Sequence, residues 1–231
     1  TCVLFFLLSG CRNKELCPQC EQETGIEIKF DWSNVSTIPE GMTVLFYNMQ
    51  SELVYAFNNV APDGETVRIN AGTYQVACYN NDSEYVQWYD IPNMDSLYVE
   101  TRKTDVLKAA GKLPEEEMVE SPDFLCGNVL PKKEIVAYSA TEQIVLLKPM
   151  PLLCRYSYSI GYLENAQYIT KTTATLSGLS QRYYLSHPDQ QHGVITMPFK
   201  ENGLTNQQQT AIGNMFNFGE CFVFNNRNYL T

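Results

Sequence analysis

Residues 25–32 read Gly-Ile-Glu-Ile-Lys-Phe-Asp-Trp, and this short stretch decides the fold class. Apolar side chains take every second position from Ile26 to Trp32, and charged side chains fill the positions between them. A period of two is typical of a strand with one face on a core and the other in water, because successive strand side chains point to opposite faces. The stretch therefore predicts a half-buried β-strand.

The same alternation recurs through the first half of the chain, between turn signals such as Pro-Glu-Gly and Pro-Asp-Gly. Abundant Tyr and Phe (15 and 11 residues) agree with it, because aromatic side chains fit a pleated surface. Seven short strands separated by turns are typical of a β-sandwich. The six beyond the first are predicted around residues 42–46, 53–57, 67–69, 74–78, 86–88 and 97–99.

The second half predicts another sandwich, beginning near residue 140 and with fewer strands. Either this domain is small or its closing strands are missing, and a missing strand would leave an edge that pairs readily with another chain. Ser177-Gly178 reads as a break between strands. The strands are predicted around residues 135–138, 144–147, 154–160, 172–176, 194–197 and 219–224.

Between the two halves, residues 103–123 interrupt the pattern. Residues 104–110 predict a helical turn or two that ends at Gly111. The acidic stretch 115–123 lies between Pro114 and Pro122 and predicts a solvated loop. A calcium site is the alternative, but the turn Gly that usually spaces calcium ligands is absent there.

The first eleven residues predict an export signal rather than a folded element. Residues 3–8 are continuously apolar, and Ser9-Gly10 precede Cys11. Six apolar residues are too few to span a bilayer, which needs about 20. The arrangement matches the end of a secretory signal followed by a lipid-accepting thiol, so the sequence is expected to begin inside its signal peptide. The alternative is a buried first strand of a cytosolic domain.

The cysteines fit an exported chain. Of eight, Cys2 would leave with the signal and Cys11 would carry lipid, and the other six leave the disulfide state open. Cys17 and Cys20 have redox-motif spacing, yet they lie in a polar tether and not at a helix N-terminus after a strand. Cys78 and Cys154 are predicted to be buried small hydrophobes. The six are Cys17, Cys20, Cys78, Cys126, Cys154 and Cys221.

Charge and motifs restrict the function. A formal net charge of −10 argues against nucleic acid as a partner, because phosphate binding needs clustered Lys and Arg. The pair His187 and His192 is read as part of a polar loop, since its spacing and Pro188 do not suit a helical metal site. No Gly-x-Ser-x-Gly and no phosphate-binding Gly-rich loop occurs. Acid pairs for glycoside hydrolysis stay open, but nothing singles one out. We predict no catalytic residue, metal or cofactor.

One strand carries a candidate binding surface. Trp88 shares the core-facing phase of its strand, as Trp32 does in the first strand, whereas Tyr85, Gln87 and Tyr89 have the opposite phase. These three could form an exposed strip that binds a glycan or a protein partner. A strip covered by the second domain fits the pattern equally well.

Several motifs in order resemble a family of lipoproteins from Gram-negative gut anaerobes that are related to fimbrillins and minor-fimbrium anchor proteins. The resemblance extends over residues 9–200 and is most specific at its N-terminal end. Cys17-Pro18-Gln19-Cys20 departs from the pattern, because relatives more often carry aromatic and His residues there. The motifs are residues 9–17, 28–33, 39–44, 71–74 and 78–82, with weaker likeness at 151–156 and 176–178.

The resemblance implies an all-β protein of two tandem transthyretin-like β-sandwich domains behind a lipid on Cys11. It implies a place at the outer membrane, facing the exterior, in fimbria anchoring, assembly or adhesion with fimbrial subunits or a host ligand. Lys14-Glu15 resembles the short signal for the outer face. A surface glycan-binding lipoprotein of a nutrient-uptake system is the alternative. The expected parts are a signal remnant (1–10), a lipidated tether (11–24), an N-terminal sandwich (25–139) and a C-terminal sandwich (140–231).

Overall fold

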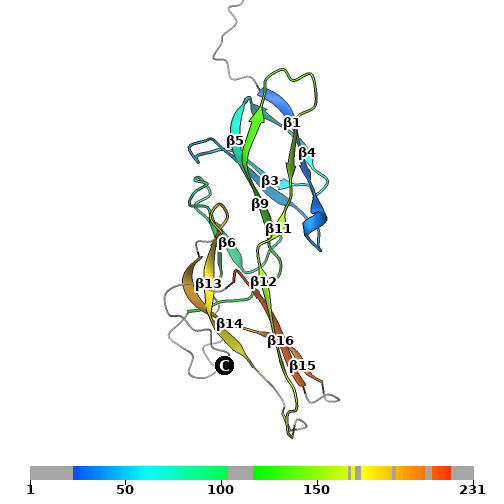
Figure 1. Cartoon of the computed structure of the whole chain (residues 1–231), viewed down its shortest axis with the longest axis vertical. Coiled ribbons are helices and arrows are strands. Elements are labelled where there is room, and N and C mark those ends of the chain that lie inside the picture. The colour runs from blue at the N-terminus through cyan, green and yellow to red at the C-terminus, as the bar shows by residue number, and fades with distance from the viewer. Residues whose placement is uncertain are drawn as a thin grey trace, which may run out of the picture.

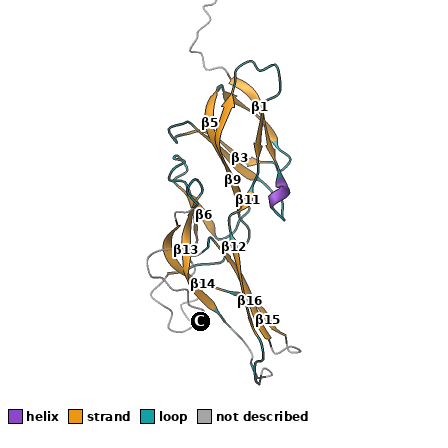
Figure 2. Ribbon diagram, in the orientation of Figure 1, coloured by secondary structure: helices purple, strands orange, loops and turns teal. Residues whose placement is uncertain are grey.

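The computed structural model describes residues 23–103, 117–165, 168–169, 173–188, 191–205 and 210–219. Strands build almost all of this part of the chain, and the one helical element described is the short 3-10 helix η1 (Trp32–Asn34). Figures 1 and 2 show the strands in two groups that follow one another along the long axis of the molecule. The predicted all-β class is confirmed, and so are all seven strands expected in the first half.

The upper group in Figure 1 is a sandwich of two sheets. Its three-stranded sheet has the order β10-β1-β4, in which β1 pairs antiparallel with β4 and parallel with β10. Its five-stranded sheet has the order β11-β9-β5-β2-β3. The bounds are β1 Glu23–Phe30, β2 Met42–Tyr47, β3 Leu53–Val60, β4 Glu65–Asn70, β5 Gly72–Asn80, β9 Cys126–Ile135, β10 Ile144–Leu147 and β11 Met150–Pro151.

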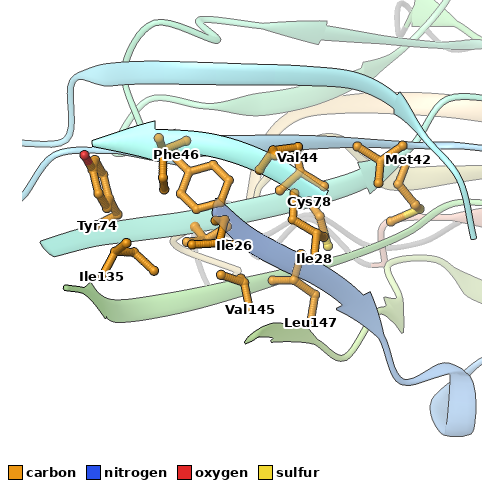
Figure 3. Packing of buried hydrophobic residues seen from close by; sticks show 14 of the residues in the cluster. Ile26, Ile28, Met42, Val44, Phe46, Tyr74, Cys78, Ile135, Val145 and Leu147 are labelled. Atoms are coloured by element: carbon orange, nitrogen blue, oxygen red, sulfur yellow. The ribbon is translucent and has the colours of Figure 1, made fainter. Parts of the chain in front are cut away.

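The alternating stretch at the start of the chain supplies the core between these two sheets. Ile26 and Ile28 of β1 are buried and lie against the five-stranded sheet (Figure 3). Phe46 from β2 is fully buried there and packs edge-on against Phe57 and Tyr74, with ring centroids 5.8 and 5.9 Å apart. Burial of these apolar side chains is the main favourable term in the stability of the sandwich.

The five-stranded sheet is buried on its other face as well. All six residues of β2 are buried, so Leu45 and Tyr47 point into a second core, away from β1. Leu185 and Phe218 from the later part of the chain reach the same core. The hydroxyl group of Tyr47 donates a hydrogen bond to the carbonyl oxygen of Ile91 at 2.7 Å. This second core joins the two groups of strands.

The lower group in Figure 1 also consists of two sheets, with the orders β6-β7-β13-β14-β8 and β12-β16-β15. Leu179, Ile195 and Met215 are fully buried between them. The bounds are β6 Val86–Tyr89, β7 Tyr98–Thr101, β8 Glu117–Met118, β12 Cys154–Ile160, β13 Thr175–Tyr184, β14 Gln191–Pro198, β15 Lys200–Thr205 and β16 Thr210–Asn217.

Strand pairing crosses the boundary expected near residue 140. β10 follows that boundary in the sequence yet pairs with β1, and β6 and β7 precede it yet lie in one sheet with β13. The division into residues 25–139 and 140–231 and the transthyretin-like character of each part stay predictions. What the pairing establishes is that each group of strands draws on both halves of the chain.

Two strand predictions in the second half are wrong. A strand expected at residues 135–138 ends at Ile135 instead, because β9 runs through residues 126–135 and pairs with β5 along most of that length. The break expected at Ser177-Gly178 is a β-bulge inside β13, where Gly178 has φ 76° and the register shifts. Strands β15 and β16 were not predicted from the sequence.

Three local predictions also need correction. Trp32 begins η1 and is not part of β1, although its ring still packs against the first core. Residues 117–123 of the acidic stretch are not a solvated loop, since β8 pairs with β14 and Val119 is fully buried. His192 lies in β14, paired with Arg182, while His187 is exposed before it. The rest of the acidic stretch and the helical turn predicted at 104–110 lie outside the described residues.

Candidate functional site

The outer face of the sheet β6-β7-β13 carries a row of three tyrosines. Tyr89, Tyr98 and Tyr184 lie directly opposite one another on neighbouring strands. The rings of Tyr89 and Tyr98 are stacked, with centroids 5.1 Å apart, and the centroids of Tyr98 and Tyr184 are 5.3 Å apart. The next positions along these strands face the core, where Val86 and Val99 are buried. The strand period of two therefore places the tyrosines on the outside.

A polar row runs beside the tyrosine row on the same face. Gln87, Glu100 and Arg182 occupy opposing positions on the same three strands. The guanidinium group of Arg182 donates from Nε to Glu100 Oε2 at 3.1 Å, and its carbon lies 4.9 Å from the centre of the Tyr98 ring. Gln181 donates a further hydrogen bond to the carboxylate of Glu100. We call the two rows together the tyrosine face.

Electrostatic coupling links the two rows. Partial burial raises the pKa of Tyr98, and the positive charge of Arg182 opposes that rise. Burial lowers the pKa of Arg182. The nearby Glu100 carboxylate and the other polar neighbours raise it by more than burial lowers it, so the net shift is upward. At neutral pH the phenol of Tyr98 therefore stays protonated beside the ion pair of Arg182 and Glu100, a combination suited to binding and not to proton transfer.

The stacking determines which surface the tyrosine face offers. Tyr98 has a neighbouring ring on each side and Arg182 above it, so the faces of its ring are largely covered. Ring edges and the outer side of Tyr89, which is 41% exposed, remain for a ligand. Sugars stack on open ring faces, whereas protein interfaces favour Tyr and Arg presented in this way.

The strip predicted from the sequence is found in part. Gln87 and Tyr89 lie on the tyrosine face, but Tyr85 precedes β6 with φ 60° and does not continue the row. The strand β13 extends the strip sideways from the later half of the chain. Tyr98, Tyr184 and Arg182 were missed, because only strand pairing brings them beside Tyr89. The period-two phase of Tyr98 and Glu100 in their own strand was the one available signal.

Two of the three cysteines in the described residues are buried and offer no reactive site. Cys78 and Cys126 are buried free thiols, as predicted for Cys78, and burial raises the pKa of both, that of Cys126 to about 12. A protonated thiol is a poor nucleophile and a poor metal ligand. The burial predicted for Cys154 is wrong: it begins the edge strand β12, whose side chains are mostly exposed.

Neither a metal-ligand cluster nor a membrane-spanning helix occurs in the part of the chain that the structure describes. No group of three His, Cys, Asp or Glu side chains there could hold a metal ion. None of its helices is long and apolar enough to cross a bilayer. Cys11, Cys17, Cys20 and Cys221 lie outside the described residues.

Comparison with known proteins gives a family and a fold. The family described as "Domain of unknown function (DUF5119)" matches residues 10–200. No curated protein matches. Among solved structures, a putative adhesin from Bacteroides ovatus ATCC 8483 is 22% identical with a TM-score of 0.67, and the match covers 96% of this chain and 76% of that protein.

Two further structures share the fold at lower identity. Putative polysaccharide binding proteins (DUF1812) from Bacteroides thetaiotaomicron VPI-5482 are 8% identical, with a TM-score of 0.60 over 89% of this chain and 74% of theirs. The fimbrial anchor protein Mfa2 from Porphyromonas gingivalis is 12% identical, with a TM-score of 0.58 over 90% of this chain and 77% of its own. At these identities the likeness establishes the fold alone.

Proposed function

This chain belongs to the DUF5119 family, and from that premise we propose that it is a lipid-anchored cell-surface protein that serves fimbria anchoring, assembly or adhesion. The observation that carries the proposal is the tyrosine face on a fold shared with a fimbrial anchor protein and a putative adhesin. A row of tyrosines beside an Arg–Glu pair is the composition expected of a protein–protein contact.

The face suits a partner that is itself extended and rich in backbone groups, such as a fimbrial subunit. Tyrosine hydroxyls at the ring edges can donate to and accept from carbonyl and amide groups, while the rings supply apolar area. The strand β6 forms the edge of its sheet, so a partner strand could pair along it beside Tyr89.

Binding to fimbriae tests this proposal. We expect purified chain to be retained by fimbriae of its own organism, and Tyr98→Ala to reduce that retention at least tenfold. Tyr138→Ala is the matched control, since Tyr138 is 84% exposed but lies outside the face. Equal retention of both variants would remove the tyrosine face from the contact. Absence of retention for the parent chain would remove the fimbrial role.

The anchor is proposed from the sequence around Cys11. Acyl chains on its thiol and on the new N-terminus would hold the protein at the outer membrane, because two or more chains give stable anchoring where one does not. Mass spectrometry of the mature N-terminus should find acylated Cys11, and Cys11→Ala should release the protein into the soluble fraction. Cys17→Ala, six residues further on, should leave it in the membrane. An unmodified Cys11 in membrane-bound protein would refute the anchor.

We propose no catalytic role. The described residues contain two buried, protonated thiols and no cluster of metal ligands, and the tyrosine face holds stacked rings beside a paired arginine. Binding explains these features without a reaction.

A surface glycan-binding lipoprotein is the alternative function. The shared fold with putative polysaccharide binding proteins and the exposed outer side of Tyr89 favour it. A glycan array separates the two functions: strong signals that Tyr89→Ala abolishes would support the alternative, and a silent array would leave the fimbrial role.

A further inference from the structure

A hollow of about 280 Å³ lies at the edge strand β6, where that strand meets residues from the ends of β2 and β5. Tyr79 and Trp88 form its aromatic part, and Asn81, Gln87 and Arg102 contribute polar groups. No acidic side chain lines it. We call this hollow the β6 pocket.

The aromatic part of the β6 pocket is rigid. Tyr79 and Trp88 are stacked with ring centroids 3.9 Å apart and an angle of 19° between their planes. Tyr79 is buried, and Trp88 is partly exposed. A fixed, partly exposed indole offers an apolar platform, and the C–H face of a sugar ring is the usual complement of such a surface.

The polar groups around the platform are oriented by their neighbours. The hydroxyl group of Thr43 donates to Oδ1 of Asn81 at 2.6 Å, so the amide nitrogen is what Asn81 offers to a ligand. Nε of Arg102 donates to the carbonyl oxygen of Val86 at 3.1 Å, which holds the guanidinium group along the edge of β6. Gln87 is exposed on the same strand. Planar amide and guanidinium groups of this kind can bind pairs of neighbouring hydroxyl groups.

The acids nearby are engaged elsewhere. Asp82 accepts from Asn80 Nδ2 at 2.7 Å and from the backbone of Glu40 at 3.0 Å, and Asp123 accepts from the backbone of Glu84 at 2.9 Å. These bonds tie down the chain between β5 and β6 and keep both carboxylates out of the pocket lining. The pocket therefore excludes a cationic ligand on charge and favours a neutral or acidic polyol.

The volume of the pocket limits the size of the polyol that it can hold. Pockets for drug-sized ligands begin at about 300 Å³. We propose that the β6 pocket binds a single pyranose unit, its C–H face on Trp88 and its hydroxyl groups on Asn81, Gln87 and Arg102. The site adjoins the tyrosine face, with which it shares Gln87, and it does not depend on lipidation or on fimbrial partners.

Fluorescence can test the pocket directly, because the chain has two tryptophans. Trp32 does not line the pocket, and its indole N–H donates to the carbonyl oxygen of Pro62 at 2.9 Å. In full chain carrying Trp32→Phe, all indole emission comes from Trp88. The probes are methyl glycosides of glucose, galactose, mannose, N-acetylglucosamine and glucuronic acid. We expect at least one to change the emission saturably, with a dissociation constant on the order of 1 mM, as suits about a dozen heavy atoms.

Two variants with a matched control make the test specific. Gln87→Ala and Asn81→Ala should each weaken binding about tenfold, while Gln50→Ala, an exposed amide outside the pocket, should bind as the parent does. Thermal unfolding of each variant identifies any loss of fold, and Gln87 is exposed on an edge strand, so its truncation is expected to leave the fold intact. A panel without a saturable response, or unchanged binding by both pocket variants, would overturn the proposal. Fimbrial retention of the Asn81→Ala protein, whose change lies in the pocket but outside the tyrosine face, reports separately on the proposed function.

Discussion

The two five-stranded sheets of this protein differ in what covers them. In the sheet β11-β9-β5-β2-β3, the strand β2, which lies between β5 and β3, is buried at all six positions, with one core on each side. In the sheet β6-β7-β13-β14-β8, one face packs inward and the other carries the tyrosine face. The comparison shows that the two sheets use their second face differently. In the first sheet that face holds the two groups of strands together, and in the second it forms a surface for a partner.

Truncation in β2 is the strongest test of this comparison. Phe46→Ala should lower the free energy of unfolding by about 3–5 kcal/mol and Leu45→Ala by about 2–5 kcal/mol, because both leave cavities in cores. Urea unfolding followed by tryptophan emission measures both. Val54→Ala on β3, where the side chain is 44% exposed, should change it by less than about 0.5 kcal/mol. A small effect of Leu45→Ala alone would mean that the second core contributes little.

The bulge in β13 gives the next largest expected effect. Gly178 has φ 76°, a conformation that an L side chain adopts only with strain, so Gly178→Ala should cost about 1 kcal/mol or more. Gly25→Ala in β1 is the control, because no atom lies within 4 Å of the added methyl group. The substitution also reduces the conformational freedom of the unfolded chain, so it should leave the free energy of unfolding unchanged or raise it. Thermal unfolding distinguishes them. Equal effects would show that the bulge does not depend on glycine.

Truncation in the tyrosine face should separate binding from stability. Tyr98→Ala removes two ring contacts and the surface below Arg182, yet the side chain lies on an outer face, so we expect a loss of about 1 kcal/mol. Urea unfolding is the measurement. Tyr98→Phe keeps the ring contacts and should retain most of that stability. A loss as large as that of Phe46→Ala would place the tyrosines among the structural elements of the sheet.

The smallest effect concerns a surface ion pair at the outer sheet of the upper sandwich. Hydrogen bonds from Ser33 and Lys148 lower the pKa of Asp31 to about 2, below the unfolded value of about 3.9. A lowered pKa gives stabilisation that is present above pH 4 and is lost as the pH falls through 2. Asp31→Asn should therefore flatten the pH dependence of the unfolding midpoint slightly in that window. An identical pH profile for both proteins would show that the pair adds nothing.

Strands with regular alternation were predictable, and those whose burial comes from distant partners were not. Residues 26–30 alternate because one face of β1 meets a core and the other meets water. β9 contains Pro131 and two lysines and lacks such a pattern, since its place is set by pairing with β5. The burial of Val119 could not be predicted from its acidic neighbours Glu117 and Glu120, because it depends on β14 and β16 lying beside it. The pattern of a short segment reflects which of its side chains face a core, but it does not show which distant strand the segment pairs with.

The candidate site divides in the same way. The phase of Gln87 and Tyr89 within one strand indicated an outward strip, but φ 60° at Tyr85 turned the chain before the strand began. Tyr184 and Arg182 are more than 80 residues away in the sequence and reach the strip through the pairing of β13 with β7. The β6 pocket was not foreseen, because Asn81 and Trp88 converge on it from different strands and loops.

By itself the sequence determined the all-β class, the first seven strands and the resemblance to lipoproteins of a fimbrial kind, and it predicts an export signal that ends before Cys11. These are properties of short segments, since a strand's period and a signal's apolar run need no distant partner. Tertiary structure alone decided which halves of the chain share a sheet, which residues complete the tyrosine face and where the β6 pocket lies. Hydrogen bonding between strands far apart in the sequence sets all three, and many different pairings are compatible with one set of strand patterns.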